Sequence, residues 1–447
     1  MDKITRALQK TSDTKCLFLG ERTIERTPEM FKILFPGQKA IVVADSNTWL
    51  VAGEKVDALL RQEGLCSEPA FIFDDPELFA EWSFLEQLET VLSGVDAIAV
   101  AVGSGVINDL TKLASWHLRR KYMIVGTATS MDGYTAYGAS VTYKGNKQTF
   151  TCPAPLGMIM DPSIAAAAPD GLSASGYADM IAKVPAGADW MLAQAAGVES
   201  IDSFSFELVQ DGLKEMLSHS ADIASRDIPA HEKLAEGLIM SGFAMQAIHT
   251  SRPASGTEHQ FSHYWDMEGL CYQGKHVSHG FKVGIGTLVS TACLEFLLSQ
   301  DIMSLDADRC ADSWPTLEEM EKTIRHIFAS KPAHAARALC ESGAKYSSKK
   351  EVALQIKSLQ SKWPELTKDI REQLYSFEQV RNHLIAVGAP YEPEMIGVSR
   401  KKLKETFDGI PYMRNRFTGI DVLHRCGLLQ AASEHLFGKG GKWEISE

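Results

Sequence analysis

Three short apolar runs in the first third of the chain constrain the fold more than any other feature. They cover residues 40–44, 97–102 and 122–125, and each is followed by polar or glycine-containing residues. Continuous apolar runs are typical of strands buried on both faces of a parallel sheet, and parallel strands need crossover connections that are usually helices. Residues 141–143 and 148–150 predict a separate β-hairpin. The N-terminal part is therefore predicted to be an α/β domain with a parallel sheet.

The pattern changes near Asp161-Pro162. From there on, apolar residues recur with helical spacing, for example over residues 205–218, 231–249, 283–299 and 350–382. We therefore predict two domains, an α/β domain over residues 1–161 and an all-α domain over residues 162–447.

The charge balance restricts the class of partner. The chain of 447 residues has 45 Lys and Arg against 57 Asp and Glu, a net charge of −12. Nucleic-acid and anionic-membrane proteins need an excess of basic surface, so neither partner is expected. One phosphorylated small substrate needs only a local basic group. The eight cysteines include no Cys-x-x-Cys pair and no run reaches the ~18–20 apolar residues of a membrane span. A cytoplasmic protein is expected.

The strand 97–102 leads directly into the turn Gly103-Ser104-Gly105-Val106-Ile107-Asn108-Asp109 and then into a helical pattern. Glycines at such a turn let backbone N–H groups approach a phosphate, whose charge the helix N-terminus favours. Asn108 stands where a Gly-x-Gly-x-x-Gly motif has its third glycine, so that motif is incomplete. The turn is either a nucleotide-binding loop or an ordinary tight βα turn.

Two more strand ends carry polar residues. Asp45 follows the strand 40–44, where an acid can hold the ribose hydroxyls of a dinucleotide, although Asp45-Ser46-Asn47-Thr48 also fits a helix cap. Thr127-Ala128-Thr129-Ser130, followed by Asp132, comes after the strand 122–125. Parallel sheets bind ligands at the carboxyl ends of their strands. A ligand-binding loop and a polar surface loop are the two interpretations.

A histidine cluster is the strongest chemical signal. Five of the 13 histidines fall between residues 249 and 279, namely His249, His259, His263, His276 and His279. Ser255-Gly256-Thr257-Glu258 has the form of a capping box, which predicts a helix with His259 and His263 one turn apart on one face. His279 follows a predicted turn, and Asp179 offers a carboxylate. Two imidazoles and one carboxylate are a common catalytic metal site. Buried core histidines are the alternative.

Several segments together resemble the sn-glycerol-1-phosphate dehydrogenase family, in particular its bacterial branch. This family lies within the dehydroquinate synthase-like and iron-containing alcohol dehydrogenase superfamily. The segments that carry the resemblance are, in order, residues 103–109, 127–134, 176–183, 251–263, 279–287 and 412–418. The resemblance implies a dehydroquinate synthase-like fold and the reduction of dihydroxyacetone phosphate to sn-glycerol 1-phosphate by NADH or NADPH.

The resemblance also implies roles for individual residues. Asp179, His259 and His279 match the ligands of one divalent metal ion per chain, zinc or nickel, and Asp132, Asp179 and His263 match positions that face the substrate. The nucleotide contacts match Asp45, Gly103, Ser104, Gly105, Val106, Ile107, Asn108, Asp109, Thr127, Ala128, Thr129 and Ser130. A homodimer is implied as well.

Two further roles follow from side-chain chemistry. His263 is not needed as a ligand, so we expect it to relay a proton, because the ordinary pKa of histidine lies near neutral pH. Arg252 precedes the predicted helix start and is expected to bind the substrate phosphate, unless it only shapes the loop. A polyol or glycerol dehydrogenase and a dehydroquinate synthase-like sugar-phosphate cyclase are the alternative functions within the same architecture.

Overall fold

The computed structural model describes residues 3–66 and 68–445. Its chain forms two compact units, each drawn from three segments. Unit 1 contains Met1–Met180, Glu207–Ser251 and Ala386–Gly388, and unit 2 contains Ile181–Phe206, Arg252–Ile385 and Ala389–Glu447. After Asp161 the secondary structure is helical, as predicted from the sequence, except for the short antiparallel pair β9 (Cys271–Tyr272) and β10 (Lys275–His276). The division into domains 1–161 and 162–447 stays a prediction.

Unit 1 is built on a six-stranded parallel sheet, which confirms the predicted fold class. The strands are β1 (Cys16–Leu19), β2 (Ala40–Asp45), β3 (Phe71–Phe73), β4 (Ile98–Gly103), β5 (Tyr122–Gly126) and β8 (Gly157–Met160). Their order is β1-β8-β5-β4-β2-β3. The three apolar runs form β2, β4 and β5 in the interior of this sheet, where both faces are buried.

Three strands have no clear signal in the sequence. The edge strands β1 and β3 are short and only partly buried. The fully buried β8 has the sequence Gly-Met-Ile-Met, which contains a single β-branched residue. Its place in the sheet comes from parallel pairing with β5 and β1, a tertiary contact that local propensity does not reveal.

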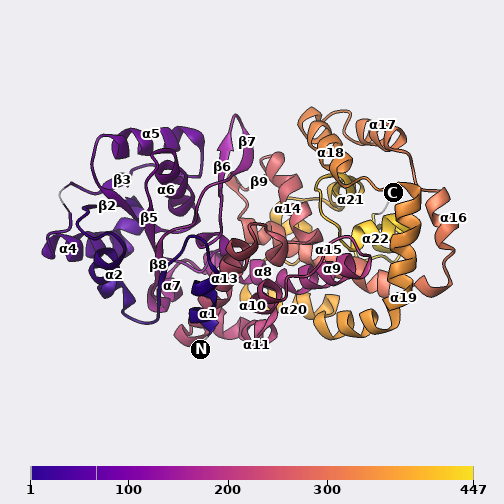
Figure 1. The fold of residues 1–447 in the computed structure, drawn as a ribbon, viewed down its shortest axis with the longest axis horizontal. Coiled ribbons are helices and arrows are strands. Elements are labelled where there is room, and N and C mark those ends of the chain that lie inside the picture. The colour runs from indigo at the N-terminus through magenta and orange to yellow at the C-terminus, as the bar shows by residue number, and fades with distance from the viewer. Residues whose placement is uncertain (1–2, 67, 446–447) are drawn as a thin grey trace. The chain divides into compact units, whose positions relative to one another are not determined.

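Helices cover both faces of the sheet (Figure 1). On one face, α2 (Thr27–Leu34) and α4 (Glu54–Gln62) bury apolar residues against β2, β4 and β5 in a single core cluster. The opposite face carries α5 (Trp82–Ser93) and α6 (Gly105–His117), which pack together. The predicted hairpin is confirmed as β6 (Ala139–Tyr143) and β7 (Asn146–Phe150). Lys144 and Gly145 have positive φ angles at its tip, as a type I′ turn requires.

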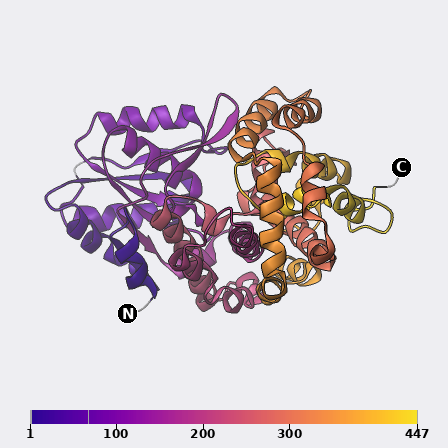
Figure 2. The same ribbon diagram turned by 45° about the vertical axis from the view of Figure 1, so that its right-hand side comes forward.

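The chain after β8 is rich in helices, as predicted, and Figure 2 shows them from a second direction. Their bounds are α7 (Pro162–Ala167), α8 (Asp170–Ile181), α9 (Lys183–Ala195), α10 (Ser203–Gln210), α11 (Leu213–Leu217), α12 (Ser220–Ala224), α13 (Ile228–Ile248), α14 (Thr257–Met267), α15 (His279–Ser299), α16 (Ala307–Asp312), α17 (Leu317–Ile327), α18 (Pro332–Lys345), α19 (Lys349–Gln373), α20 (Phe377–Val387), α21 (Arg400–Gly409), α22 (Gly419–Arg425) and α23 (Leu429–Phe437).

Two predicted helices are interrupted. The run 205–218 is split into α10 and α11, because Gly212 takes a left-handed conformation with φ of 78°. The run 350–382 is split into α19 and α20, because Leu374 is extended and ends the first helix. A backbone break of this kind leaves the apolar spacing nearly intact, so periodicity alone does not detect it.

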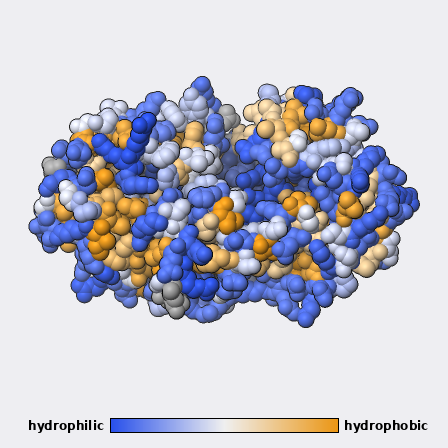
Figure 3. Space-filling view, viewed as in Figure 1, coloured by the Kyte–Doolittle hydropathy of each residue, from blue (hydrophilic) through white to orange (hydrophobic). Residues whose placement is uncertain are grey.

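Helix α15 is long and apolar enough to cross a membrane, although the sequence predicts no such span. Within the protein, 78% of its apolar window is buried, which is typical of a core helix. The face shown in Figure 3 is mostly hydrophilic, with hydrophobic residues in separate groups. Buried packing therefore accounts for the apolar character of α15.

Gly176 on α8 is the tightest backbone contact in unit 1. A Cβ atom at this position would lie 1.9 Å from the carbonyl oxygen of Thr129 and 3.2 Å from Cδ1 of Leu238. Only glycine therefore allows α8 to pack directly on the segment that follows β5. The same helix carries Asp179 one turn later. The contact at Gly176 therefore fixes the position of Asp179 relative to the segment that follows β5.

We expect Gly176→Ala to lower the free energy of unfolding by ~1–3 kcal/mol, because backbone atoms must move to make room for the methyl group. Gly343→Ala in α18 is the matched control, since a Cβ atom there meets nothing within 4 Å. This control should be stabilised by up to ~1 kcal/mol through helix propensity. Urea denaturation measures both variants. Equal midpoints for the two would contradict the packing role of Gly176.

Candidate metal centre and ligand sites

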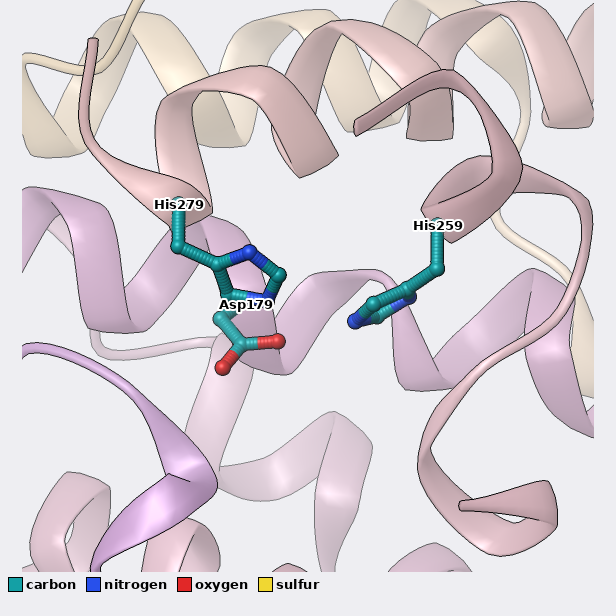
Figure 4. Close-up of side chains that lie close together, drawn as sticks. All are labelled: Asp179, His259 and His279. Atoms are coloured by element: carbon teal, nitrogen blue, oxygen red, sulfur yellow. The ribbon is translucent and has the colours of Figure 1, made fainter. Parts of the chain in front are cut away.

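Three predicted metal ligands come together in the structure. Asp179 lies in the last turn of α8, His259 in the first turn of α14, and His279 is the first residue of α15. Their ligand atoms all lie within 4.8 Å of one another. Figure 4 shows the two imidazoles and the carboxylate pointing toward one another.

Close packing of two helices brings the imidazoles together. A Cβ atom on Gly286 of α15 would lie 2.3 Å from the carbonyl oxygen of Glu258 in α14, so the two helix backbones touch at this glycine. The ring centroids of His259 and His279 are then 5.4 Å apart. The start of α15 is fixed by Ser278, whose hydroxyl accepts a hydrogen bond from the Phe281 N–H.

Glu258 orients the imidazole of His259. Its buried carboxylate accepts hydrogen bonds from the Gly256 N–H at 2.6 Å and from Nδ1 of His259 at 2.7 Å. With the proton on Nδ1, Nε2 carries the lone pair that binds a metal ion. The predicted capping role of Ser255 is wrong, because Gly256 is the N-cap residue. The carboxylate of Asp189 accepts a hydrogen bond from the Thr257 N–H at 2.7 Å instead.

The donor set fits a divalent metal ion. Two neutral imidazoles and one carboxylate suit zinc, nickel or iron, and three protein ligands leave coordination positions for a substrate. A structural zinc site would instead close the shell with a fourth protein ligand. Among the residues that the structure describes, the arrangement therefore fits a metal ion with open coordination positions.

His263 lies near this cluster but is not part of it. Its ring centroid is 6.4 Å from that of His259, one turn earlier in α14. Burial lowers its pKa well below the ordinary value, and the charges of Arg414 and neighbouring groups lower it further. This lowering of the pKa is contrary to the sequence-based expectation of a pKa near neutral pH.

Asp132 lies directly beside the Asp179 carboxylate. Its backbone N–H donates a hydrogen bond to Oδ2 of Asp179 at 3.0 Å, and its own Oδ2 accepts one from the Ser241 hydroxyl at 2.8 Å. Ser241 lies on α13 and carried no signal in the sequence. The segment after β5 is thereby tied to one of the candidate metal ligands.

The predicted nucleotide-binding segments share one edge of the sheet. Asp45, the turn at 103–109 and the segment 127–130 follow β2, β4 and β5, which are neighbours in the sheet. The chain leaves β2 toward one side of the sheet and leaves β4 toward the other. Such a topological switch point is where open α/β sheets bind ligands.

The turn after β4 is a tight strand-to-helix turn that depends on glycine. A Cβ atom on Gly103 would lie 2.6 Å from Cβ of Ile107, so the turn requires glycine there. Helix α6 begins at Gly105 with Ser104 as its N-cap residue, and no side chain caps it. The first N–H groups of a helix have no partner within the helix and are available to an anion.

Several residues near this turn have structural roles. The Asn108 side chain accepts a hydrogen bond from the Tyr122 hydroxyl at 3.0 Å, and Oδ2 of Asp109 accepts one from the Ser140 N–H at 3.2 Å. The fully buried Lys112 donates to the carbonyl oxygens of Gly133, Ala136 and Gly138. The Asn108 N–H also donates within the protein, to the Ser104 carbonyl oxygen at 3.0 Å. The predicted nucleotide contacts of Asn108 and Asp109 stay a prediction.

The segment 127–130 is also held by its neighbours. The hydroxyl of Thr129 donates to that of Ser173 in α8 at 3.1 Å, and the Ala128 carbonyl accepts a hydrogen bond from the Tyr134 hydroxyl at 2.7 Å. These residues lie at the carboxyl end of β5 and are buried. The segment is therefore a rigid part of unit 1 and not a polar surface loop.

Asp45 serves as a helix cap, one of its two predicted roles. Its Oδ1 accepts hydrogen bonds from the N–H groups of Asn47 and Thr48, both at 2.9 Å. The Thr48 hydroxyl accepts the reciprocal bond from the Asp45 N–H at 3.0 Å. One carboxylate oxygen is thus used by the cap, and the carboxylate still lies at the end of β2.

Arg252 is completely buried. Its guanidinium lies 3.0 Å from the Glu199 carboxylate and donates hydrogen bonds to the carbonyl oxygens of Asp189 and Phe417. Burial, together with the nearby Glu258, raises the pKa of Asp189 to about 7. These contacts favour the alternative that Arg252 shapes this region.

Comparison with known proteins now adds the family. Residues 18–169 match the family model of iron-containing alcohol dehydrogenase. A glycerol-1-phosphate dehydrogenase [NAD(P)+] from Halalkalibacterium halodurans is 35% identical over 62% of this chain and 69% of its own. The chain belongs to the glycerol-1-phosphate dehydrogenase family. A family member from Geobacillus thermodenitrificans is 28% identical over 88% of each chain.

Solved structures agree on the fold. Glycerol dehydrogenase from Schizosaccharomyces pombe has a TM-score of 0.60 at 16% identity, covering 95% of this chain and 91% of its own. Maleylacetate reductase from Agrobacterium tumefaciens has a TM-score of 0.61 at 13% identity, covering 94% and 96%. The glycerol-1-phosphate dehydrogenase family therefore shares its architecture with other dehydrogenases, and the substrate depends on the site.

We expect His259→Ala to lose the metal ion, because only two ligands would remain. Metal analysis of the purified protein should fall from about one ion per chain to nearly none. His263→Ala is the matched control on the same helix face and should keep its metal while kcat falls by ~10²–10⁴-fold. Metal loss from both variants would mean that His263 is itself a ligand or an essential support.

Proposed function

We propose that this chain reduces dihydroxyacetone phosphate to sn-glycerol 1-phosphate, using NADH or NADPH and one divalent metal ion per chain. The observation that carries the proposal is the cluster of Asp179, His259 and His279. Relatives named glycerol-1-phosphate dehydrogenase [NAD(P)+] support the reaction and the cofactor class. The switch point beside β2, β4 and β5 supports a dinucleotide.

Asp179, His259 and His279 would hold the metal ion, zinc or nickel. When bound, this ion supplies Lewis acidity toward the substrate carbonyl. Glu258 keeps His259 in the tautomer that binds metal, and the Asp132 N–H holds the Asp179 carboxylate in place.

His263 and Asp132 act on the substrate. When bound, NADH or NADPH would supply the hydride to C2 of the substrate, and the C2 oxygen then needs a proton. His263 would relay that proton, because its ring N–H can donate to the C2 oxygen while its other ring nitrogen takes a proton from water. The Asp132 carboxylate, oriented by the Ser241 hydroxyl, accepts a hydrogen bond from the hydroxyl on C1.

Backbone groups of the turn after β4 bind the cofactor diphosphate. The N–H groups of Gly105, Val106 and Ile107 begin α6, where the helix dipole favours negative charge. The segment 127–130 flanks the nicotinamide half, and the Asp45 carboxylate accepts hydrogen bonds from the adenosine ribose.

Two further properties belong to the same proposal. The eight cysteines are free thiols, which supports a reducing compartment such as the cytoplasm. We also infer a homodimer, which the family resemblance implies. Sedimentation of the metal-loaded protein tests the assembly.

The reaction is tested by following NADH oxidation with dihydroxyacetone phosphate, combined with chiral analysis of the product. We expect stoichiometric NADH consumption and only the sn-glycerol 1-phosphate enantiomer. Product formation without net NADH consumption would indicate a sugar-phosphate cyclase type of reaction instead. Equal kcat/KM for dihydroxyacetone and its phosphate would indicate a polyol dehydrogenase.

We expect NADH to be preferred over NADPH, because Asp45 repels a 2′-phosphate. Asp45→Asn keeps the helix cap, since Asn caps as well as Asp, but removes the charge. The kcat/KM ratio of NADPH to NADH should rise about five- to tenfold in this variant, the effect of ~1 kcal/mol between solvated charges. Asp45→Ala removes cap and charge together and serves to separate the two. An unchanged ratio in both variants would place Asp45 away from the ribose.

A further inference from the structure

Two arginines of the C-terminal segment 413–418 reach the start of α14. Nη1 of Arg416 donates to the Ser255 carbonyl oxygen at 2.6 Å, and Nη1 of Arg414 lies 3.5 Å from the Ser255 hydroxyl. Ser255 lies two residues before the first residue of α14, the helix that carries His259 and His263. The segment is therefore attached to the N-terminal end of this helix.

A third arginine holds the same segment from α18. Nε of Arg337 donates to the Met413 carbonyl oxygen at 3.3 Å, directly before Arg414. Its Nη2 lies 3.2 Å from the carboxylate of Glu341. Arg337 thus fixes the backbone from which Arg414 extends and keeps a second guanidinium nearby.

The charges of Arg414 and Arg337 act where His263 lies. Both guanidinium groups are close enough to His263 to act on it electrostatically. Arg414 and Arg337 therefore place two cations near the part of α14 that carries this histidine. A substrate that carries a phosphate dianion is attracted to such cations.

Arg414 differs from the two buried arginines near it. Arg252 and Arg416 are buried, so a ligand cannot reach their guanidinium groups. Arg414 is only partly buried, so a ligand can reach it. A guanidinium presents paired N–H groups that match two phosphate oxygens.

We propose that Arg414, supported by Arg337, binds the phosphate group of the substrate, and that Arg252 does not. This inference rests on the proposed function, which requires a phosphorylated substrate. The three attachments through Ser255 and Met413 hold the segment in place, so little side-chain entropy is lost on binding.

The test compares dihydroxyacetone phosphate with dihydroxyacetone in four proteins. These are the wild type, Arg414→Ala, Arg414→Lys and the control Arg325→Ala, which changes an exposed arginine on α17. The kcat/KM ratio of the phosphorylated to the unphosphorylated substrate should fall ~10–100-fold in Arg414→Ala, the effect of a hydrogen bond to a charged group. Lysine should recover part of the ratio, because it keeps the charge but loses the paired geometry. The control should keep the wild-type ratio.

Inorganic phosphate provides a second readout. It should inhibit the wild type competitively against dihydroxyacetone phosphate, and its inhibition constant should rise by a similar factor in Arg414→Ala. If Arg414→Ala does not fold, Arg414→Lys and Arg337→Ala give the same comparison.

The outcomes separate the two proposals. A wild type without preference for the phosphorylated substrate would overturn the proposed function. A wild type with that preference, which Arg414→Ala and Arg337→Ala both retain, would leave the function intact and overturn this assignment. Loss of the preference in Arg252→Ala alone, with metal content and thermal midpoint unchanged, would return the phosphate to Arg252.

Discussion

The contact between α14 and α15 at Gly286 is the constraint on which the candidate site depends. His259 and His279 lie on different helices, so the distance between their imidazoles is set by how closely the two backbones approach. A side chain larger than hydrogen at Gly286 would overlap the Glu258 carbonyl and push the helices apart. A metal site tolerates deviations of only ~0.2 Å in its ligand distances. Close packing of α14 on α15 is thus a condition for binding a metal ion with both histidines.

Buried charges support this packing from the other side. Asp189 accepts hydrogen bonds from the N–H groups of Thr257 and Gly419, and so joins the starts of α14 and α22. Next to it, the buried Arg252 forms an ion pair with the partly exposed Glu199. Burying charges is costly, and such groups are retained where they fix a particular geometry. Here that geometry is the start of α14, the turn that carries Glu258 and His259.

The sequence predicts the parts of the fold that are locally encoded. The runs that form β2, β4 and β5 are apolar over their full length, and the histidines of the cluster are close in the chain. Both features can therefore be recognised in the sequence alone. The short edge strands and β8 cannot be recognised in this way, because they form strands through pairing with their neighbours and not through local propensity.

The residues of the candidate site differ in the same respect. Glu258 is next to a ligand histidine in the sequence, and this position is a signal for its role. Ser241 and Lys112 form hydrogen bonds with residues that are far from them in the chain, so no local pattern indicates their roles. Ser255 accepts hydrogen bonds from Arg414 and Arg416, which lie 159 and 161 residues later in the chain. Motif spacing cannot predict a contact between residues so far apart.

The alternation of the chain between the two units bears on how the protein is made. Unit 1 takes its sheet from the first part of the chain and α13 from a segment that follows a passage through unit 2. Helix α13 packs on α1 (Lys3–Lys10), α7 and the turn at Asp132. During synthesis the strands of the sheet therefore leave the ribosome well before α13, the helix that completes unit 1. Until α13 is made, the apolar surface that it covers is exposed to solvent. Because each unit contains three segments of the chain, no single cleavage of the backbone can release a complete unit. We expect proteolysis or truncation at one position to leave both units incomplete.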